Sequence, residues 1–132
     1  MATLTATATL TGSGLTSSTL SITKNPAVTV LGDVQIRRIT LGTTTTKVLD
    51  AADWNESGAM LWLFNTEATG GKDIFIGLDT DGTPQAGLDS THMVIKPGEW
   101  AFFPWAAEVS LWADVSADTC QLEYGIFERA AS

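Results

Sequence analysis

The last third of the chain consists of short apolar segments separated by tight turns, and this pattern constrains the fold more than any other feature of the sequence. Between residues 91 and 127 each apolar segment ends at residues that favour turns, most clearly at Lys96-Pro97-Gly98-Glu99. Pro97 at the second position and Gly98 at the third are typical of a type II turn, whose third residue needs a positive φ. The pattern predicts an all-β fold, an antiparallel β-sandwich or jelly roll of about nine or ten strands.

The length and the composition agree with this fold. The 132 residues suit a single domain, which at this size buries roughly two-thirds of the surface that its unfolded chain exposes. Only 17% of the residues are charged, against about 25% in a typical soluble domain. Threonine takes their place, at alternate positions in residues 3–11 and in an unbroken run at residues 43–46. Because β-branched side chains suit a half-exposed pleated face, this composition favours a β-rich surface.

The acidic balance of the chain limits its partners. With 15 acidic and 7 basic residues the formal net charge is -8, and the basic residues are scattered apart from the pair Arg37-Arg38. Binding to nucleic acid or to anionic lipid requires clustered cations, so we expect neither nucleic acid nor a membrane as a partner. No apolar run approaches the roughly 20 residues of a membrane helix, and the residues after Met1 lack the pattern of a secretory signal. We therefore expect synthesis in a cytoplasm.

The use of cysteine and histidine argues against a reactive site. Cys120 is the single cysteine, which excludes an internal disulfide, and we expect it to be a small buried side chain at the start of a strand. His92 is the single histidine, and its neighbours Asp89 and Ser90 lie too close along the chain to converge on it as a catalytic triad. We therefore predict no catalytic residue and no enzymatic activity.

Acidic residues elsewhere give only weak indications of a metal site or an acid-base pair. Asp79, Asp81 and Asp89 surround Gly82 in a pattern typical of calcium loops, but the further oxygen ligands and the flanking helices of an EF-hand are missing. Several carboxylates are close enough in sequence to suggest a glycosidase dyad, yet nothing singles out one pair. These pairs are Glu108 with Asp114 and Glu123 with Glu128. We therefore predict no metal and no cofactor.

The start of the chain alternates strictly between apolar residues and threonine. Leu4, Ala6, Ala8 and Leu10 fall on one face of a predicted strand, and the threonines fall on the other. This apolar face is too thin to be held against a core by burial alone. We therefore predict that residues 1–14 form an N-terminal arm or edge strand, with a neighbouring subunit as one candidate partner, and that residues 15–132 form a single β-sandwich domain.

Two segments further along carry unusual apolar patterns. Residues 59–64 have no polar alternation, so we expect this strand to be covered on both sides, within the sandwich or by a neighbouring subunit. Between Val34 and Leu41 the apolar positions change phase by one residue at Arg37-Arg38. A β-bulge at this pair would reconcile the two phases, and so would a strand that passes to a different neighbour.

The aromatic residues form the strongest candidate for a contact surface. The chain has 5 tryptophans, and residues 100–105 are apolar at every position. If Trp100 and Phe102 face the core, then Phe103 and Trp105 face the opposite side and require a covering partner. Large aromatics on an outer face are enriched in protein interfaces, whereas ordinary core filling and the stacking of sugars are the other two interpretations. The residues that we predict to form an interface are Leu4, Leu10, Trp100, Phe103, Trp105 and Trp112.

A series of short motifs follows in the second half of the chain, over about residues 60 to 128. They are Leu63-Phe64-Asn65-Thr66, Ile74-Phe75-Ile76-Gly77-Leu78-Asp79, Val94-Ile95-Lys96-Pro97-Gly98-Glu99, Phe102-Phe103-Pro104 and Leu122-Glu123-Tyr124-Gly125-Ile126-Phe127-Glu128. In this order the motifs resemble those of small virion proteins of tailed bacteriophages. The resemblance implies a β-sandwich or jelly-roll structural protein, of which capsid decoration (cement) proteins are one kind and tail or head-tail connector proteins another.

For a decoration protein, the resemblance implies a homo-oligomer that binds the major capsid protein, and analogy with small jelly rolls on threefold axes suggests a trimer. An acidic protein also suits the outside of a capsid better than its DNA-filled interior. We therefore expect a structural protein on the capsid exterior of the virion, assembled in the host cytoplasm. A carbohydrate-binding β-sandwich module is the alternative from another class. An enzyme of the cupin or glycosidase type is the weakest reading, because one histidine excludes a multi-histidine metal site.

Overall fold

The computed structural model describes residues 2–12, 20–24, 27–54, 57–79 and 93–130. This part of the chain contains eleven β-strands and one short 3-10 helix, which confirms the all-β fold. In chain order the elements are β1 (Ala2–Thr5), β2 (Ala8–Gly12), β3 (Leu20–Lys24), β4 (Ala27–Leu41), β5 (Thr46–Leu49), η1 (Ala51–Asp53), β6 (Ala59–Asn65), β7 (Ile74–Asp79), β8 (Met93–Ile95), β9 (Trp100–Trp105), β10 (Ser110–Val115) and β11 (Cys120–Arg129).

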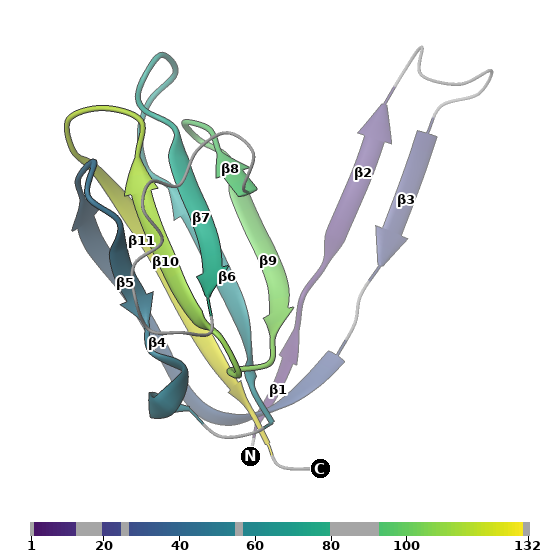
Figure 1. The fold of residues 1–132 in the computed structure, drawn as a ribbon. Helices are drawn as coiled ribbons and strands as arrows, with labels where there is room; N and C mark the ends of the chain where they lie inside the picture. The colour runs from purple at the N-terminus through teal and green to yellow at the C-terminus, as the bar shows by residue number, and fades with distance from the viewer. Residues whose placement is uncertain (1, 13–19, 25–26, 55–56, 80–92, 131–132) are drawn as a thin grey trace.

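Two antiparallel sheets pack face to face, as Figure 1 shows. One sheet has the order β1-β4-β11-β6-β9 and the other the order β5-β10-β7-β8. Apart from the arm strand β1, the pairings are nested: β4 pairs with β11, β5 with β10, β6 with β9 and β7 with β8. A long antiparallel ribbon that rolls up on itself produces this nesting, so the sandwich is a jelly roll.

The core lies between the two sheets, and the alternation of each strand supplies it. Leu61 and Leu63 of β6 are buried, as are Leu122 and Ile126 of β11. The facing sheet contributes Ile74, Ile76, Leu111, Ala113 and Val115. Because successive side chains of a strand point to opposite faces, the residues between these core positions are directed to the outside of each sheet.

The predicted turn before β9 is present. Gly98 has a φ of 78°, and the Glu99 N–H donates a hydrogen bond of 2.9 Å to the Lys96 carbonyl. A positive φ at the third residue and a bond between the first and fourth residues are features of a type II turn. The Glu99 carboxylate also accepts a 3.0 Å hydrogen bond from the Lys96 N–H. This turn leads directly into β9 and helps to set which of its residues face the core.

Strand β9 forms one edge of the larger sheet. The Asn65 N–H donates to the Glu99 carbonyl over 3.0 Å, so the odd-numbered residues of the strand direct their backbone groups toward β6. Pro104 is even-numbered and stands opposite Met60, and its nitrogen therefore faces the free edge. Proline is tolerated at this position because no bond of the ladder needs its missing N–H.

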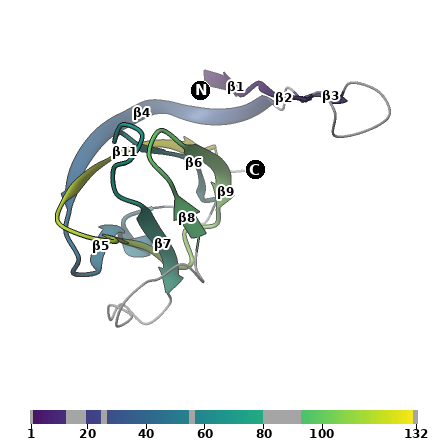
Figure 2. The same ribbon diagram turned by 90° about the horizontal axis from the view of Figure 1, so that it is seen from above.

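The N-terminal arm has a different extent from the one predicted. Strand β1 pairs with the beginning of β4, with Thr5 opposite Ala27. Strands β2 and β3 then form a separate two-stranded ribbon, in which Leu10 stands opposite Ile22. Because β3 pairs with β2, residues 20–24 belong to the arm, and the boundary expected after residue 14 is wrong. Figures 1 and 2 both show this β2–β3 hairpin standing off to one side of the two sheets.

The change of phase in β4 is not caused by a β-bulge. The register with β11 runs without interruption from Val34 opposite Phe127 to Leu41 opposite Cys120, and its one shift lies between Phe127 and Arg129. The bulge considered at Arg37-Arg38 is therefore wrong. Ile39 packs against the core and Leu41 is buried in it, whereas Ile36 is 62% exposed on the outer face. The apolar pattern changes phase because β4 has apolar side chains on both faces.

Candidate functional site: an aromatic groove beside the arm

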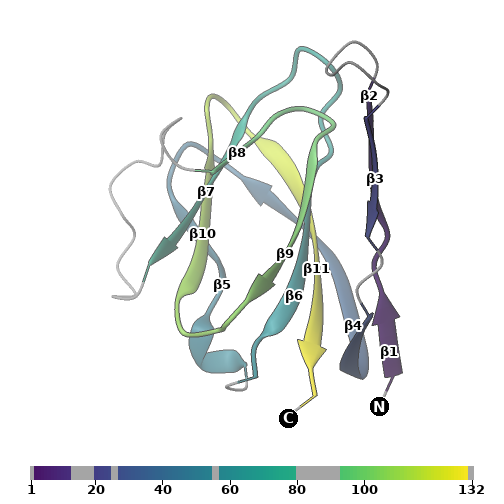
Figure 3. The ribbon, with the colours of Figure 1, turned by 90° about the vertical axis from the view of Figure 1, so that its right-hand side faces the viewer.

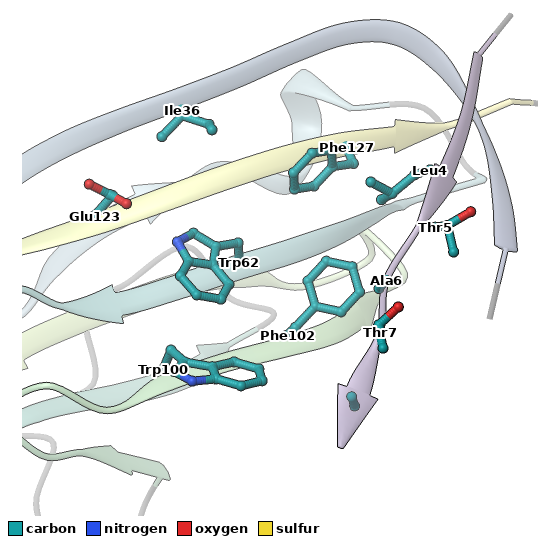
Figure 4. Close-up of a pocket in the computed structure, with 11 residues that line it drawn as sticks. Leu4, Thr5, Ala6, Thr7, Ile36, Trp62, Trp100, Phe102, Glu123 and Phe127 are labelled. Atoms are coloured by element: carbon teal, nitrogen blue, oxygen red, sulfur yellow. The ribbon is translucent and has the colours of Figure 1, made fainter. Parts of the chain in front are cut away.

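The outer face of the larger sheet carries a groove of about 540 Å³. Figure 4 shows the side chains that line it. One wall comes from residues 4–8 of the arm, and the floor comes from β4, β6, β9 and β11. The floor residues are Ile36, Trp62, Trp100, Phe102, Glu123 and Phe127. We call this feature the aromatic groove.

The floor of the aromatic groove follows from the alternation of its strands. The positions of β6, β9 and β11 that do not face the core hold aromatic residues, which therefore meet on one surface. The Trp62 and Trp100 rings are stacked with centroids 5.3 Å apart. Phe102 and Phe127 meet edge to face at 6.2 Å. Trp100 is 55% exposed, so the ring system is accessible from solvent.

A glycine of β11 lies between two residues of the groove floor. Gly125 of β11 stands opposite Ile36 on one side and opposite Trp62 on the other. A Cβ added at this position would lie 3.4 to 3.5 Å from atoms of Phe127, Trp62 and Ile36, which is ordinary contact distance. Gly125 itself is buried and does not line the groove, so these three side chains cover the backbone of β11 at this point.

The arm wall of the groove shows the alternation predicted for the first residues. Leu4 and Ala6 are half-buried, whereas Thr3, Thr5 and Thr7 are exposed. Figure 3 shows β1 lying beside the first part of β4, which anchors this wall at the edge of the sheet. The arm therefore already packs against the outer face at its base.

Charges are sparse in the groove. Glu123 is the one charged residue of its lining, and its carboxylate pairs with the Arg38 guanidinium at 3.1 Å. Residues 1–24 contain one basic residue, Lys24, and no acidic residue. The other 6 basic residues and all 15 acidic residues lie in residues 25–132. The arm is therefore nearly neutral, whereas the sandwich is strongly acidic.

The structure brings together two of the residues that we predicted to form an interface, Leu4 and Trp100. It reverses the orientation expected for β9. Trp105 is 2% exposed and lies in the core, and Phe103 packs against the core, so neither residue belongs to an outer contact face. The odd-numbered positions of β9 face inward because Leu61 and Leu63, opposite Phe103 and Ala101, are core residues.

The other two predicted interface residues lie elsewhere. Trp112 of β10 is 5% exposed, and the Lys47 ammonium stands 5.1 Å from the centre of its ring, so it is not an open contact residue. Leu10 lies in β2, in the hairpin beyond the groove. The turn residues Pro97 and Gly98 lie where they were predicted.

Sequence reasoning missed most of the groove floor. Ile36 and Phe127 were not singled out as surface residues, although the change of phase between Val34 and Leu41 includes Ile36. The sequence did indicate an apolar outer face on β6. Residues 59–64 are apolar at every position, and we predicted from this that the strand is covered on both sides. What the sequence did not show is that β4, β9 and β11 carry apolar outer residues at matching positions.

Most of the residues around the single histidine and the possible calcium loop lie in a part of the chain that the structure does not describe. Asp81, Gly82, Asp89, Ser90 and His92 lie outside the described residues, and Asp79 ends β7. The described residues contain no group of three or more His, Cys, Asp and Glu side chains that could hold a metal ion.

The two carboxylate pairs have separate structural roles where the structure describes them. Asp114 is buried and accepts a 2.7 Å hydrogen bond from the Thr45 hydroxyl, whereas Glu108 is exposed. Glu123 forms the ion pair with Arg38.

Cys120 is buried at the start of β11, where its position was predicted. Burial, followed by the nearby charge of Glu67, raises the pKa of the thiol to about 11 from its ordinary value of 9.0. Because the thiolate is the reactive form, the thiol is unreactive at neutral pH.

Comparisons of the chain with protein-family models, with curated proteins and with solved structures found no match. Among the described residues there is also no helix that is long and apolar enough to cross a membrane. The aromatic groove and the arm are therefore the basis for assigning a function.

Proposed function

We propose that this protein is a structural protein of a tailed-phage virion, a capsid decoration protein that assembles with copies of itself and binds the major capsid protein on the outside of the shell. The observation that carries the proposal is the second apolar face of the larger sheet. A jelly roll needs one apolar face per sheet for its own core. This sheet has two, and the outer one bears Trp62, Trp100, Phe102 and Phe127.

An outer face of this kind suits contact between proteins. Exposed aromatic residues are enriched at the centres of interfaces, where charged residues are depleted. The groove has this composition, since its one charged residue, Glu123, is paired with Arg38. The polar side chains that line it are Thr5, Thr7 and Glu123, which is a small set for orienting a small polar substrate.

The position on the outside of a capsid is supported by charge. The formal net charge of -8 would be repelled by packaged DNA, whereas the exterior of a shell imposes no such penalty. The resemblance of motifs such as Lys96-Pro97-Gly98-Glu99 to those of small virion proteins of tailed phages supports the same class. A trimer is the assembly that analogy with small jelly rolls suggests.

The proposal is tested on particles of the virus that encodes the chain. Cryo-electron microscopy is expected to show density for the jelly roll on the outer surface of the capsid, at regular positions on the lattice of the major capsid protein. Purified protein added to expanded shells that lack it should co-sediment with them. Density confined to the tail or to the connector would overturn the decoration role and leave a tail or connector protein.

Carbohydrate binding is a second candidate because Trp100 is 55% exposed and stacked on Trp62, as sugar platforms often are. A glycan array and titration of tryptophan fluorescence with the array's best ligands test it. Quenching that is lost in Trp100→Ser would favour this function. No binding on the array would remove it.

A further inference from the structure

We propose that the aromatic groove is the binding site for the β2–β3 hairpin of a second copy of this chain. The inference rests on the proposed function in one respect, that copies of the protein assemble. It adds which surfaces meet: the hairpin of one copy lies on Trp62, Trp100 and Phe102 of the next.

The β2–β3 hairpin needs a partner. Within the described residues its two strands pair only with each other, and an isolated two-stranded hairpin is marginally stable in water. Its register places Leu10 opposite Ile22, between the hydroxyl pairs Thr9–Thr23 and Thr11–Ser21, whereas Lys24 stands opposite Ala8 at the base of the hairpin. The Thr9 and Thr23 hydroxyl groups lie 3.4 Å apart on an exposed face. A ribbon with this pattern has the composition to place its other face against an apolar surface.

The composition of the arm avoids electrostatic repulsion between two acidic copies. Copies with a net charge of -8 repel one another, and an acidic segment would be rejected by the sandwich of its neighbour. The arm lies in the longest stretch of the chain without an acidic residue, residues 1–32, and its single charged side chain, Lys24, is positive. On the groove side the one charged lining residue, Glu123, is already paired with Arg38. The hairpin can therefore approach the groove of an acidic neighbour without a like-charge penalty.

The base of the arm already packs against the groove of its own chain. Leu4 and Ala6 of each chain are half-buried along one wall of its own groove, so arm sequence of this composition does pack against this face. Beyond Ala8 the hairpin of the same chain leads away from the sheets, as Figures 1 and 2 show. The rest of the floor, where Trp100 is 55% exposed, is open to a segment of another molecule.

This contact is head to tail, because the hairpin of one copy and the groove of another are different surfaces. Repetition of a head-to-tail contact closes into a ring when the rotation between copies permits. A closed ring would use every hairpin and cover every groove.

Site-specific cross-linking tests which surfaces meet. Trp100 is replaced by the photoreactive residue p-benzoylphenylalanine in the full-length protein, and nitrogen-15-labelled and unlabelled copies are mixed when dilute and then concentrated. Irradiation and digestion with trypsin, which releases residues 1–24 as one peptide, should give cross-links from position 100 to that peptide, including pairs of one heavy and one light partner. The control places the probe at Leu78, which is 49% exposed on the other sheet, and should give no such pairs.

The inference is overturned if heavy-light pairs are absent, if position 100 reaches residues 1–24 only within one chain, or if it joins copies through other peptides. Light scattering gives an independent measurement. Trp100→Ser should lower the native mass toward the 14.0 kDa of a monomer, at concentrations where Leu78→Ser retains the wild-type mass. Equal masses for the two variants would also contradict the inference. Circular dichroism establishes that both variants are folded.

The two proposals fail separately. Copies that assemble through other surfaces and still bind capsids would remove the hairpin contact and leave the decoration role. Hairpin-to-groove cross-links in a protein that binds no capsid would support the hairpin contact and remove the decoration role.

Discussion

The side-chain amide of Asn65 donates a 2.9 Å hydrogen bond to the Ile95 carbonyl and so joins the end of β6 in one sheet to the end of β8 in the other. The same amide nitrogen donates to the Lys72 carbonyl at 2.9 Å. Its oxygen accepts from the Glu67 N–H at 3.1 Å. Asn65 is fully buried, so one side chain satisfies several backbone groups at the place where both sheets end.

Replacing this side chain should therefore destabilise the fold. We expect Asn65→Ala to lower the free energy of unfolding by about 3 kcal/mol, because buried carbonyl and amide groups lose their partners. Denaturation with urea measures the change. The neighbouring Thr66→Val, which removes an exposed hydrogen bond to Gln121, should change it by about 0.5 kcal/mol and serves as the control. Equal effects of the two variants would contradict the bridging role of Asn65.

Replacing Gly98, the third residue of the turn before β9, by a β-branched residue should lower the stability of the fold. Gly98 has a φ of 78° and no atom within 4 Å of where a Cβ would lie, so a substitution there meets backbone strain without a steric clash. We expect Gly98→Val to lower the free energy of unfolding by about 1 to 3 kcal/mol. Gly42, which is equally open and lacks a positive φ, provides the matched variant Gly42→Val. An unchanged melting temperature for Gly98→Val would argue against this turn type.

Gly125 should accept a methyl group without loss of stability. Gly125→Ala adds a methyl group at contact distance from Trp62 and Ile36, and it removes a residue that weakens strands by about 0.5 to 1 kcal/mol. We therefore expect the melting temperature to stay the same or rise. Thermal unfolding followed by circular dichroism measures the change, and a lower melting temperature would show that the methyl group does not fit between these side chains.

Cys120 should make the stability of the protein depend on alkaline pH. The pKa of the thiol is about 11 in the folded protein and near 9.0 when it is exposed on unfolding. Between these values the unfolded chain loses the proton and the folded chain keeps it, so stability falls as the pH rises. The loss approaches about 1.4 kcal/mol per pH unit. Other groups titrate in this range, so the measurement is the difference in slope between the wild type and Cys120→Ala. Identical slopes from pH 9 to pH 11 would mean that Cys120 ionises as easily in the fold as outside it.

The sequence was a good guide to features that depend on local pattern. The Lys96-Pro97-Gly98-Glu99 turn, the all-β class, the buried Cys120 and the two-faced apolar strand at residues 59–64 all follow from turn chemistry or from the period of a strand. These properties require no knowledge of which strands are neighbours.

The features that depend on neighbours were harder to predict. The orientation of β9 was assigned in reverse, because every residue from Trp100 to Trp105 is apolar and the alternation gives no sign of which face is inside. The bulge at Arg37-Arg38 was considered for a related reason. Ile36 looked out of phase because a solvent-facing isoleucine is unusual, and only the outer residues of β6, β9 and β11 explain why it is there.

The proline on the free edge of β9 affects how copies can accumulate. An exposed edge strand normally offers a template on which further chains add as strands, which is how soluble β-proteins begin to form fibrils. The nitrogen of Pro104 faces that edge without a hydrogen to donate, and a strand arriving there would find its ladder interrupted. At a high local density, such as many copies crowded onto one particle, this interruption disfavours open-ended stacking along β9 and leaves broad-face contacts as the route to ordered assembly.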